Sequence, residues 1–236
     1  MISASFIFLV VLTYSQTAYS NVEKVIFTSS LAEPYPTDAS FANLLLVPLS
    51  EERPTVRTEL DVSFPNSSAR DGQVHWFFLE GLRPQQRYEV RICWPATQPT
   101  AFSLATFPVD AVLSDSSLLL SVSDYAYGRH EKLSAGDMES LQQRKTAVRP
   151  DTTILFLQIL AAADYFSLND TLMTAPPPVI VDIILDRYIW NVFPESLIPT
   201  ALYLVLIAAF AWLFSGWMAK ACTAPFIQLS AAKKSE

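Results

Sequence analysis

Residues 81–94 read GLRPQQRYEVRICW, and the second half of this stretch decides the fold class. From Tyr88 onward, apolar and polar side chains alternate, which is the period of a β-strand with one buried face. Glu89 and Arg91 then belong to the outer face of the strand. The buried face is predicted to consist of Tyr88, Val90, Ile92 and Trp94.

The segment from Gly81 to Arg91 resembles the tyrosine corner of fibronectin type III and related sandwiches. In such a corner, a leucine and a tyrosine pack where the chain passes from one sheet to the other, and the tyrosine hydroxyl binds to upstream backbone. In this chain the two residues are Leu82 and Tyr88.

Short runs rich in β-branched and aromatic residues recur around this stretch, separated by clusters of Pro, Asn, Asp and Ser. We therefore predict a mainly β fold, in which residues 21–123 form an immunoglobulin/fibronectin-III-like β-sandwich. Its predicted strands are Val22–Thr28, Asn43–Leu49, Val56–Val62, Gln73–Leu79, Arg87–Trp94, Ala101–Thr106 and Ser117–Val122.

Residues 124–196 break this pattern. Ser134 is expected to cap a short polar helix that reaches Lys145. Two strongly apolar runs follow at 152–163 and 179–185, and length alone does not decide whether the first is helix or strand. We interpret residues 124–196 as a polar linker followed by a membrane-proximal apolar segment.

Residues 1–20 have the layout of a secretory signal peptide. An apolar run at 6–12, too short to span a bilayer, precedes the small residues Ala18 and Ser20. This pattern predicts cleavage before Asn21, with the following region delivered across the endoplasmic reticulum (ER) membrane.

A second apolar segment, 197–219, holds 23 residues without a charge. As a helix it rises about 34 Å, which is enough to cross a hydrocarbon core of about 30 Å. We predict a transmembrane helix here. Aromatic residues flank it as in interfacial belts, namely Trp190, Phe193, Tyr203, Trp212 and Trp217.

The charges on either side of this helix predict its orientation. Residues 21–195 carry 13 basic and 22 acidic side chains, whereas residues 220–236 carry three lysines and one glutamate. Because basic flanks lie on the cytosolic side, the chain is expected to be a single-pass type I protein with a luminal domain and a cytosolic tail.

Lys233 and Lys234 stand fourth and third from the end of this tail. Their position looks like the dilysine retrieval signal of ER membrane proteins, which a receptor reads as an address. The sequence therefore predicts an ER-membrane location.

Two sequons in the luminal region predict N-glycosylation at Asn66 and Asn169. The two cysteines, Cys93 and Cys222, fall on opposite sides of the membrane in this topology and cannot pair with each other. Cys93 lies in an apolar strand pattern, so we interpret it as a buried core residue.

The sequence offers little for catalysis. Its histidines are His75 and His130, and it contains no HExxH, GxSxG, GxGxxG or Walker-type motif. We interpret His75 as a strand residue rather than a metal ligand. A carboxylate pair among Asp164, Asp182 and Asp186 would need a helix, but the run around Asp182 looks like a strand that ends in a turn.

We therefore expect no catalytic residue, no metal and no cofactor, and a protein that is not an enzyme by itself. The formal net charge of −7 argues against a nucleic-acid partner, because such binding requires a basic face.

Within the predicted span, Ala211, Ser215 and Ala219 recur at a spacing of four. They predict a small-residue face on which another helix could approach closely. The alternative is a span that faces only lipid.

Three parts of the chain carry a family resemblance: the signal peptide, the segment YEVRICWPATQPT at 88–100, and the segments VDIILD at 181–186 and NVFPESL at 191–197 ahead of a single span. This organisation is similar to that of the fungal Pga1-type non-catalytic subunit of GPI mannosyltransferase II. The resemblance implies an accessory subunit that supports a multi-span catalytic partner in the ER membrane, where the partner adds the second mannose in GPI-anchor biosynthesis. It implies no ligand-binding residues.

Two other functions remain open at this point. One is an ER–Golgi cargo receptor or a chaperone-like binding module. The other is the accessory subunit of the first GPI mannosyltransferase, which has the same topology.

Overall fold

The computed structural model describes residues 21–30, 44–66, 69–133, 136 and 153–233. Contacts divide the chain into two compact units, residues 1–185 and residues 186–236. Two β-sheets account for most of the first unit, and a short hairpin followed by a long apolar helix forms the second. The mainly β fold is confirmed.

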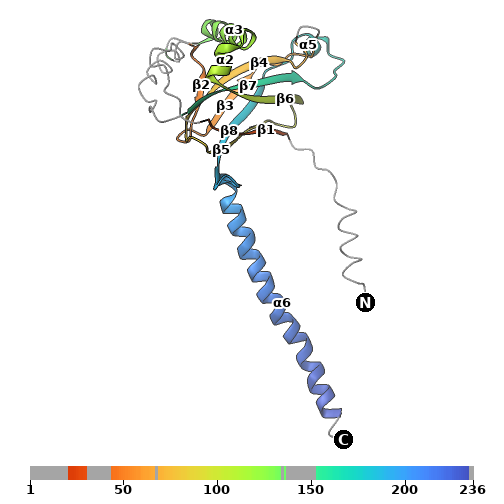
Figure 1. Cartoon of the computed structure of the whole chain (residues 1–236). Helices are drawn as coiled ribbons and strands as arrows, with labels where there is room; N and C mark the ends of the chain where they lie inside the picture. Colours follow the sequence, from red (N-terminus) through yellow and green to blue (C-terminus); the bar gives the residue numbers. More distant parts are fainter. Residues whose placement is uncertain (1–20, 31–43, 67–68, 134–135, 137–152, 234–236) are drawn as a thin grey trace. The chain divides into compact units, whose positions relative to one another are not determined.

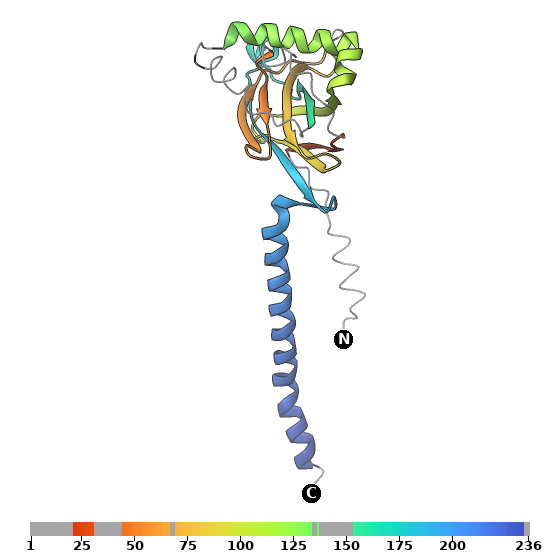
Figure 2. The same ribbon diagram turned by 60° about the vertical axis from the view of Figure 1, so that its left-hand side comes forward.

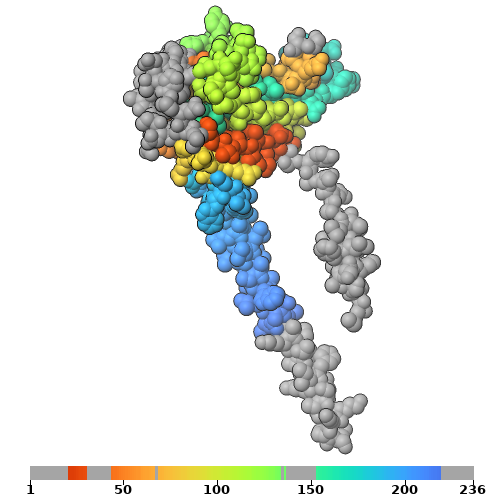
Figure 3. All heavy atoms as spheres, in the orientation of Figure 1, coloured from red at the N-terminus to blue at the C-terminus, as the bar shows by residue number. Residues whose placement is uncertain are grey.

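One sheet has the strand order β1-β5-β8-β3. β1 pairs antiparallel with β5, with Val25 opposite Val90, and β3 pairs antiparallel with β8, with Val56 opposite Ile183. β1 lies at the edge of this sheet, on the surface seen in Figure 3. The bounds are β1 (Val22–Thr28), β3 (Thr55–Leu60), β5 (Arg87–Cys93) and β8 (Val179–Ile189).

The other sheet has the strand order β2-β4-β7-β6. β4 and β6 pair antiparallel with β7, whereas β2 pairs parallel with β4. The apolar run at 152–163, which sequence left open, is therefore a central strand. The bounds are β2 (Val47–Leu49), β4 (Gln73–Leu82), β6 (Thr100–Pro108) and β7 (Thr153–Ala163).

The two sheets share one hydrophobic core. Its members come from strands of both sheets and include Leu49, Phe77, Leu79, Ile92, Leu157, Val181 and Ile183. Burying such side chains removes apolar surface from water, which is the main favourable term in folding. The sheets therefore form a sandwich with its interior between them.

The predicted buried face of the strand at 88–94 is confirmed in three positions, because Tyr88, Val90 and Ile92 are fully buried. Trp94 is half-buried, and its ring packs against Phe102 with centroids 4.7 Å apart. Glu89 was predicted on the other face of the strand, and the structure shows that it is buried as well. Lys24 lies 3.2 Å and Arg91 lies 3.8 Å from its carboxylate oxygens, so its charge is paired.

A helical layer covers the opposite face of the second sheet (Figures 1 and 2). It consists of α2 (Val109–Ser114) and α3 (Ser116–Lys132). Outward-facing side chains of β4 and β7 pack against these helices in a second core, formed by Leu46, Trp76, Phe78, Val112, Val122 and Phe156.

The predicted strand Ser117–Val122 is wrong, because these residues lie in α3. The side chain of Asp115 caps this helix by accepting hydrogen bonds from the backbone N–H groups of Ser117 and Leu118. Val122 and Ala126, four residues apart, are its buried positions. The four-residue spacing of the buried positions is that of a helix, so residues 117–122 form a helix although their short apolar run also suits a strand.

The immunoglobulin/fibronectin-III-like arrangement is not confirmed. The helical layer and the parallel β2–β4 pair are not part of the predicted sandwich. In addition, β7 and β8 occupy interior positions in the two sheets. The sheets thus draw on residues 22–189 instead of 21–123, because the apolar run that was taken as membrane-proximal supplies core strands. The predicted polar helix from Ser134 to Lys145 lies outside the described residues, apart from position 136.

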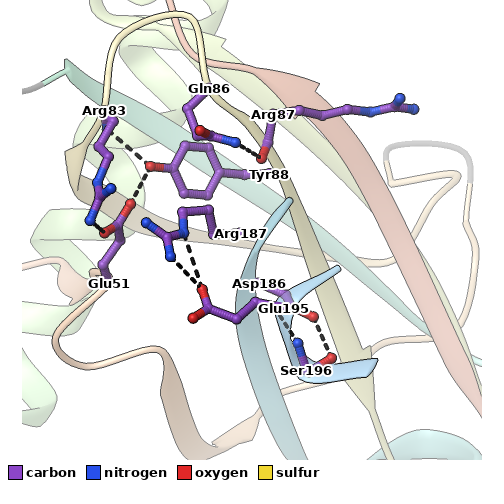
Figure 4. A network of polar contacts seen from close by, with 9 residues as sticks. All are labelled: Glu51, Arg83, Gln86, Arg87, Tyr88, Asp186, Arg187, Glu195 and Ser196. Atoms are coloured by element: carbon purple, nitrogen blue, oxygen red, sulfur yellow. Dashed lines mark hydrogen bonds and ion pairs between the residues drawn. The ribbon is translucent and has the colours of Figure 1, made fainter. Parts of the chain in front are cut away.

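The tyrosine-corner contact is present (Figure 4). The backbone N–H of Arg83 donates to the Tyr88 hydroxyl at 2.9 Å, and this hydroxyl donates to Oε1 of Glu51 at 2.5 Å. The guanidinium of Arg83 lies 3.0 Å from the same carboxylate. Burial and the Glu51 contact raise the pKa of Tyr88 above its ordinary value, so the hydroxyl stays protonated as a donor.

The second unit begins at Asp186, within the last part of β8. β9 (Phe193–Pro194) folds back on β8, with Phe193 opposite Ile189. A short 3-10 helix, η3 (Glu195–Leu197), leads into α6 (Ile198–Lys233), as Figure 2 shows. Pro199 lies in the first turn of α6, where its missing N–H breaks no intrahelical bond.

Candidate functional site

The segment Glu195–Met218 is the one helical stretch in the described part of the chain that is long and apolar enough to cross a membrane. No part of its most apolar window is buried inside the protein, and Figure 3 shows the atoms of this helix in blue. The predicted span at 197–219 corresponds to this stretch. α6 continues as helix to Lys233, through most of the predicted tail.

Two pairs of polar residues tie the end of β8 to the start of this helical stretch (Figure 4). Oδ1 of Asp186 accepts the backbone N–H of Ser196 at 3.2 Å, and the Ser196 hydroxyl donates to the other carboxylate oxygen. Arg187 donates from Nε and Nη2 to Glu195, at 3.1 and 2.9 Å. We call these four residues the hairpin clamp. It holds the β8–β9 hairpin against η3.

Sequence reasoning missed the hairpin clamp. Asp186 was considered only as a catalytic carboxylate, but it is buried and bonded to Ser196. The sequence does contain a pattern that could have indicated these contacts. Asp186 and Arg187 precede a turn, and Glu195 and Ser196, which bind them, follow it.

The predicted helix-packing residues Ala211 and Ser215 are exposed on α6, as close approach by another helix requires. The backbone of Ala219 is helical, and its side chain lies outside the described residues. Of the predicted retrieval pair, Lys233 is the last residue of α6, whereas Lys234 lies outside the described residues, as does the signal peptide at 1–20.

Both predicted glycosylation asparagines are exposed and lie outside the helices and strands. The side chain of Asn66 accepts the backbone N–H of Ala69 at 2.7 Å. Asn169 caps α5 (Asp170–Thr174), and its Oδ1 accepts from the N–H of Thr171 at 3.0 Å and from the Thr171 hydroxyl at 2.6 Å. Each asparagine is therefore at the surface, where a glycan has room.

A pocket of about 330 Å³ lies in the first unit, lined in part by residues on either side of Asn169. Gln98 lines the pocket, and two hydrogen bonds fix its side chain. It donates to Pro178 O at 3.1 Å and accepts from Ile180 N at 3.2 Å. The Tyr165 hydroxyl donates to Leu172 O at 3.2 Å. The lining is mainly apolar and includes Val62, Pro99, Thr100, Tyr165, Leu172 and Val179.

Of the acids considered for catalysis, Asp164 and Asp182 lie in the first unit. Asp182 binds Arg57 through two hydrogen bonds of 2.7 Å, which lower the pKa of its carboxyl. Asp164 is exposed at the end of β7. Among the described residues, no group of three or more potential ligands could hold a metal ion.

His75 lies in β4, as its strand interpretation predicts. It is buried, and its Nε2 lies 2.7 Å from the carbonyl oxygen of Asp61. Cys93 was predicted in the core, but it is half-buried at the end of β5, on the face opposite Ile92. The strand alternation itself places it there, and partial burial raises the pKa of its thiol.

These features define a class of protein: a β-sandwich with a helical layer, followed by one helix that could anchor it in a membrane. No protein-family model, curated protein or solved structure matches the chain. Its function is therefore argued from the residues themselves and from the resemblance that they carry.

Proposed function

We propose that the protein is a non-catalytic accessory subunit of an ER-membrane GPI mannosyltransferase complex. It supports a multi-span catalytic partner that adds the second mannose in GPI-anchor biosynthesis. The observation that carries the proposal is the complete exposure of the apolar window of α6. Such a surface is stable only in lipid or against other membrane helices.

The exposed pair Ala211 and Ser215 supports assembly rather than anchoring alone. Small side chains allow two helix backbones to approach closely, and the serine hydroxyl can donate a hydrogen bond across the contact. The resemblance to the mannosyltransferase subunit, together with the lysines at 233 and 234, points to the particular complex and membrane.

The helix contact can be tested by affinity purification of the full chain in mild detergent. The double variant Ala211→Leu/Ser215→Leu should recover less of the multi-span transferase than the wild type does. Ala209→Leu/Gly216→Leu is the matched control, because at 3.6 residues per turn the centre of its two side chains lies about 130° away around the helix. Equal recovery with both variants would remove the small-residue face from the proposal.

The ER location has a separate test. Replacing both Lys233 and Lys234 by serine should move the chain from the ER to later compartments, since a retrieval receptor could no longer read the tail. Unchanged ER staining of this variant would contradict the retrieval signal, while leaving the helix contact standing.

A second candidate function, a cargo-binding or chaperone-like module, is favoured by the apolar pocket at Gln98 and Tyr165. Such a protein would co-purify with soluble luminal proteins instead of a transferase. Substituting Val179→Gln in the pocket would then release them, whereas the helix variants would not.

A further inference from the structure

The β8–β9 hairpin ends in a tight turn over residues 189–192. The backbone N–H of Val192 donates to the carbonyl oxygen of Ile189 at 3.0 Å. The two central residues, Trp190 and Asn191, have φ angles of +51° and +57°. Positive φ at both central positions is the mark of a type I′ turn.

Trp190 is an unfavourable residue for this turn. Type I′ turns favour Asn, Asp and Gly, and a bulky side chain in the left-handed region costs about 1–2 kcal/mol. Trp190 is 93% exposed, so packing within the chain does not offset this cost. Asn191, in contrast, suits its position. The indole is therefore strained and does not pack in the folded chain. Its contribution to folding does not explain why a tryptophan stands at this position.

The surroundings of the turn are apolar and close in sequence to the candidate span. Val192 is 75% exposed, and Phe193, Leu197 and Ile198 are exposed as well. Only η3 separates β9 from α6. The hairpin clamp fastens β8 to η3, and β9 runs directly into η3, so the turn cannot swing independently of the helix start.

We propose that the turn Trp190–Val192 is a lipid-binding tip that inserts at the headgroup level of the bilayer that α6 crosses. Indole combines an apolar ring with one N–H donor, and this combination favours the boundary between headgroups and acyl chains. The hairpin clamp sets the depth of the tip relative to the first turn of the helix. The proposal rests on membrane anchoring by α6 and goes beyond any role in a complex.

The size of the tip favours lipid over a protein partner. A stable protein interface buries roughly 800 Å² on each side, which a three-residue tip cannot supply. An interfacial tryptophan, however, needs no larger surface than its own ring. Contact with a membrane protein is therefore the competing outcome of the test.

The test uses the full chain in phosphatidylcholine vesicles, with Cys93 and Cys222 replaced by alanine. An environment-sensitive fluorophore is attached in turn to Asn191→Cys and Val192→Cys, so that Trp190 stays in place. Leu206→Cys in α6 reports insertion of the helix. Leu168→Cys is the control, because Leu168 is also 93% exposed but lies in the first unit.

The two tip labels should show blue-shifted emission and strongest quenching by spin labels on the lipid headgroup. The Leu206 label should be quenched best by a spin label deep in the acyl chain, and the Leu168 label should remain aqueous. Tip labels as aqueous as the Leu168 label would overturn the proposal; if the Leu206 label is still lipid-exposed, anchoring by α6 survives. An aqueous Leu206 label would overturn both.

A further comparison separates lipid from protein. If the tip labels are aqueous in vesicles but blue-shifted in the purified complex, a protein covers the turn and the lipid proposal is wrong. Trp190→Asn, which suits a type I′ turn, should reduce headgroup quenching of the Val192 label without changing that of the Leu206 label. Unchanged quenching of the Val192 label would show that the indole does not hold the tip in lipid.

Discussion

The sandwich and α6 use the same aliphatic side chains in opposite ways. Leu157 on β7 is fully buried in the core between the sheets, whereas Leu206 on α6 is 61% exposed. Burial of a leucine during folding contributes about 1.5–3 kcal/mol. Leu206 gains nothing comparable until lipid or another helix covers it. With α6 as a membrane anchor, as proposed above, separate equilibria would govern the two regions, namely folding for the first and membrane insertion for the second.

The sandwich should be disrupted most strongly at Gly72, which has a φ of +82°. A Cβ at this position would lie 2.1 Å from the carbonyl oxygen of Ala161 in the central strand β7. We expect Gly72→Ala to lower the free energy of unfolding by about 4 kcal/mol or more. Denaturant unfolding of the full chain in detergent, followed by near-UV circular dichroism, measures this loss.

Gly128 in α3 is the control for this substitution, because a Cβ there meets nothing within 4 Å. Gly128→Ala should be neutral or stabilising by up to about 1 kcal/mol. Equal stability of the two variants would contradict the close approach of β7.

Comparing substitutions at Leu157 and Leu206 gives the next largest expected effect on the stability of the sandwich. Leu157→Ala should destabilise the sandwich by about 3 kcal/mol, since it removes buried surface and leaves a cavity. Leu206→Ala should leave the unfolding transition of the sandwich unchanged. If both variants lower this transition equally, α6 contributes to the sandwich core and the division into two equilibria is wrong.

A substitution at the tyrosine corner is expected to lower the free energy of unfolding by a smaller amount. Tyr88→Phe removes the hydroxyl that accepts from Arg83 and donates to Glu51, which should cost about 1–2 kcal/mol. Tyr165→Phe also removes a hydroxyl, but this one makes a single exposed bond to Leu172, so its loss should be near zero. Chemical denaturation of both variants gives the difference, and an inverted order would refute the role of the corner.

The smallest effect is a pH dependence at His75. Burial lowers the pKa of this imidazole below its ordinary value of 6.5, despite the opposing contact with Asp61 O. The unfolded chain therefore binds the proton more readily, and the free energy of unfolding should fall as the pH drops below 6.5. His75→Phe should flatten this slope. A slope that is unaltered in His75→Phe would assign the effect to other groups.

Strand periodicity predicted much of the sandwich because a half-buried strand repeats every second residue. The strand at 22–28 has the predicted bounds, and Tyr88, Val90 and Ile92 have the predicted burial. The helix α3 was missed because its start, Ser117–Val122, is a short apolar run in which helix and strand cannot be told apart.

The assembly of the sheets was not predictable from local pattern. β7 and β8 lie in the interior of sheets whose other strands, apart from β9, come from 22–108, and only long-range pairing reveals this. The hairpin clamp was missed for the same reason, because it joins residues eight to ten positions apart across a turn with an unusual Trp-Asn centre. The candidate span was predictable, since length and apolarity alone define it.

The most direct test of the proposed function is the mannose content of GPI precursors in cells that lack this chain. The account predicts that a precursor with one mannose accumulates, because the catalytic partner that adds the second mannose has lost its support. A precursor without mannose would assign the chain to the first mannosyltransferase. Normal processing of the precursors would contradict a role in this complex.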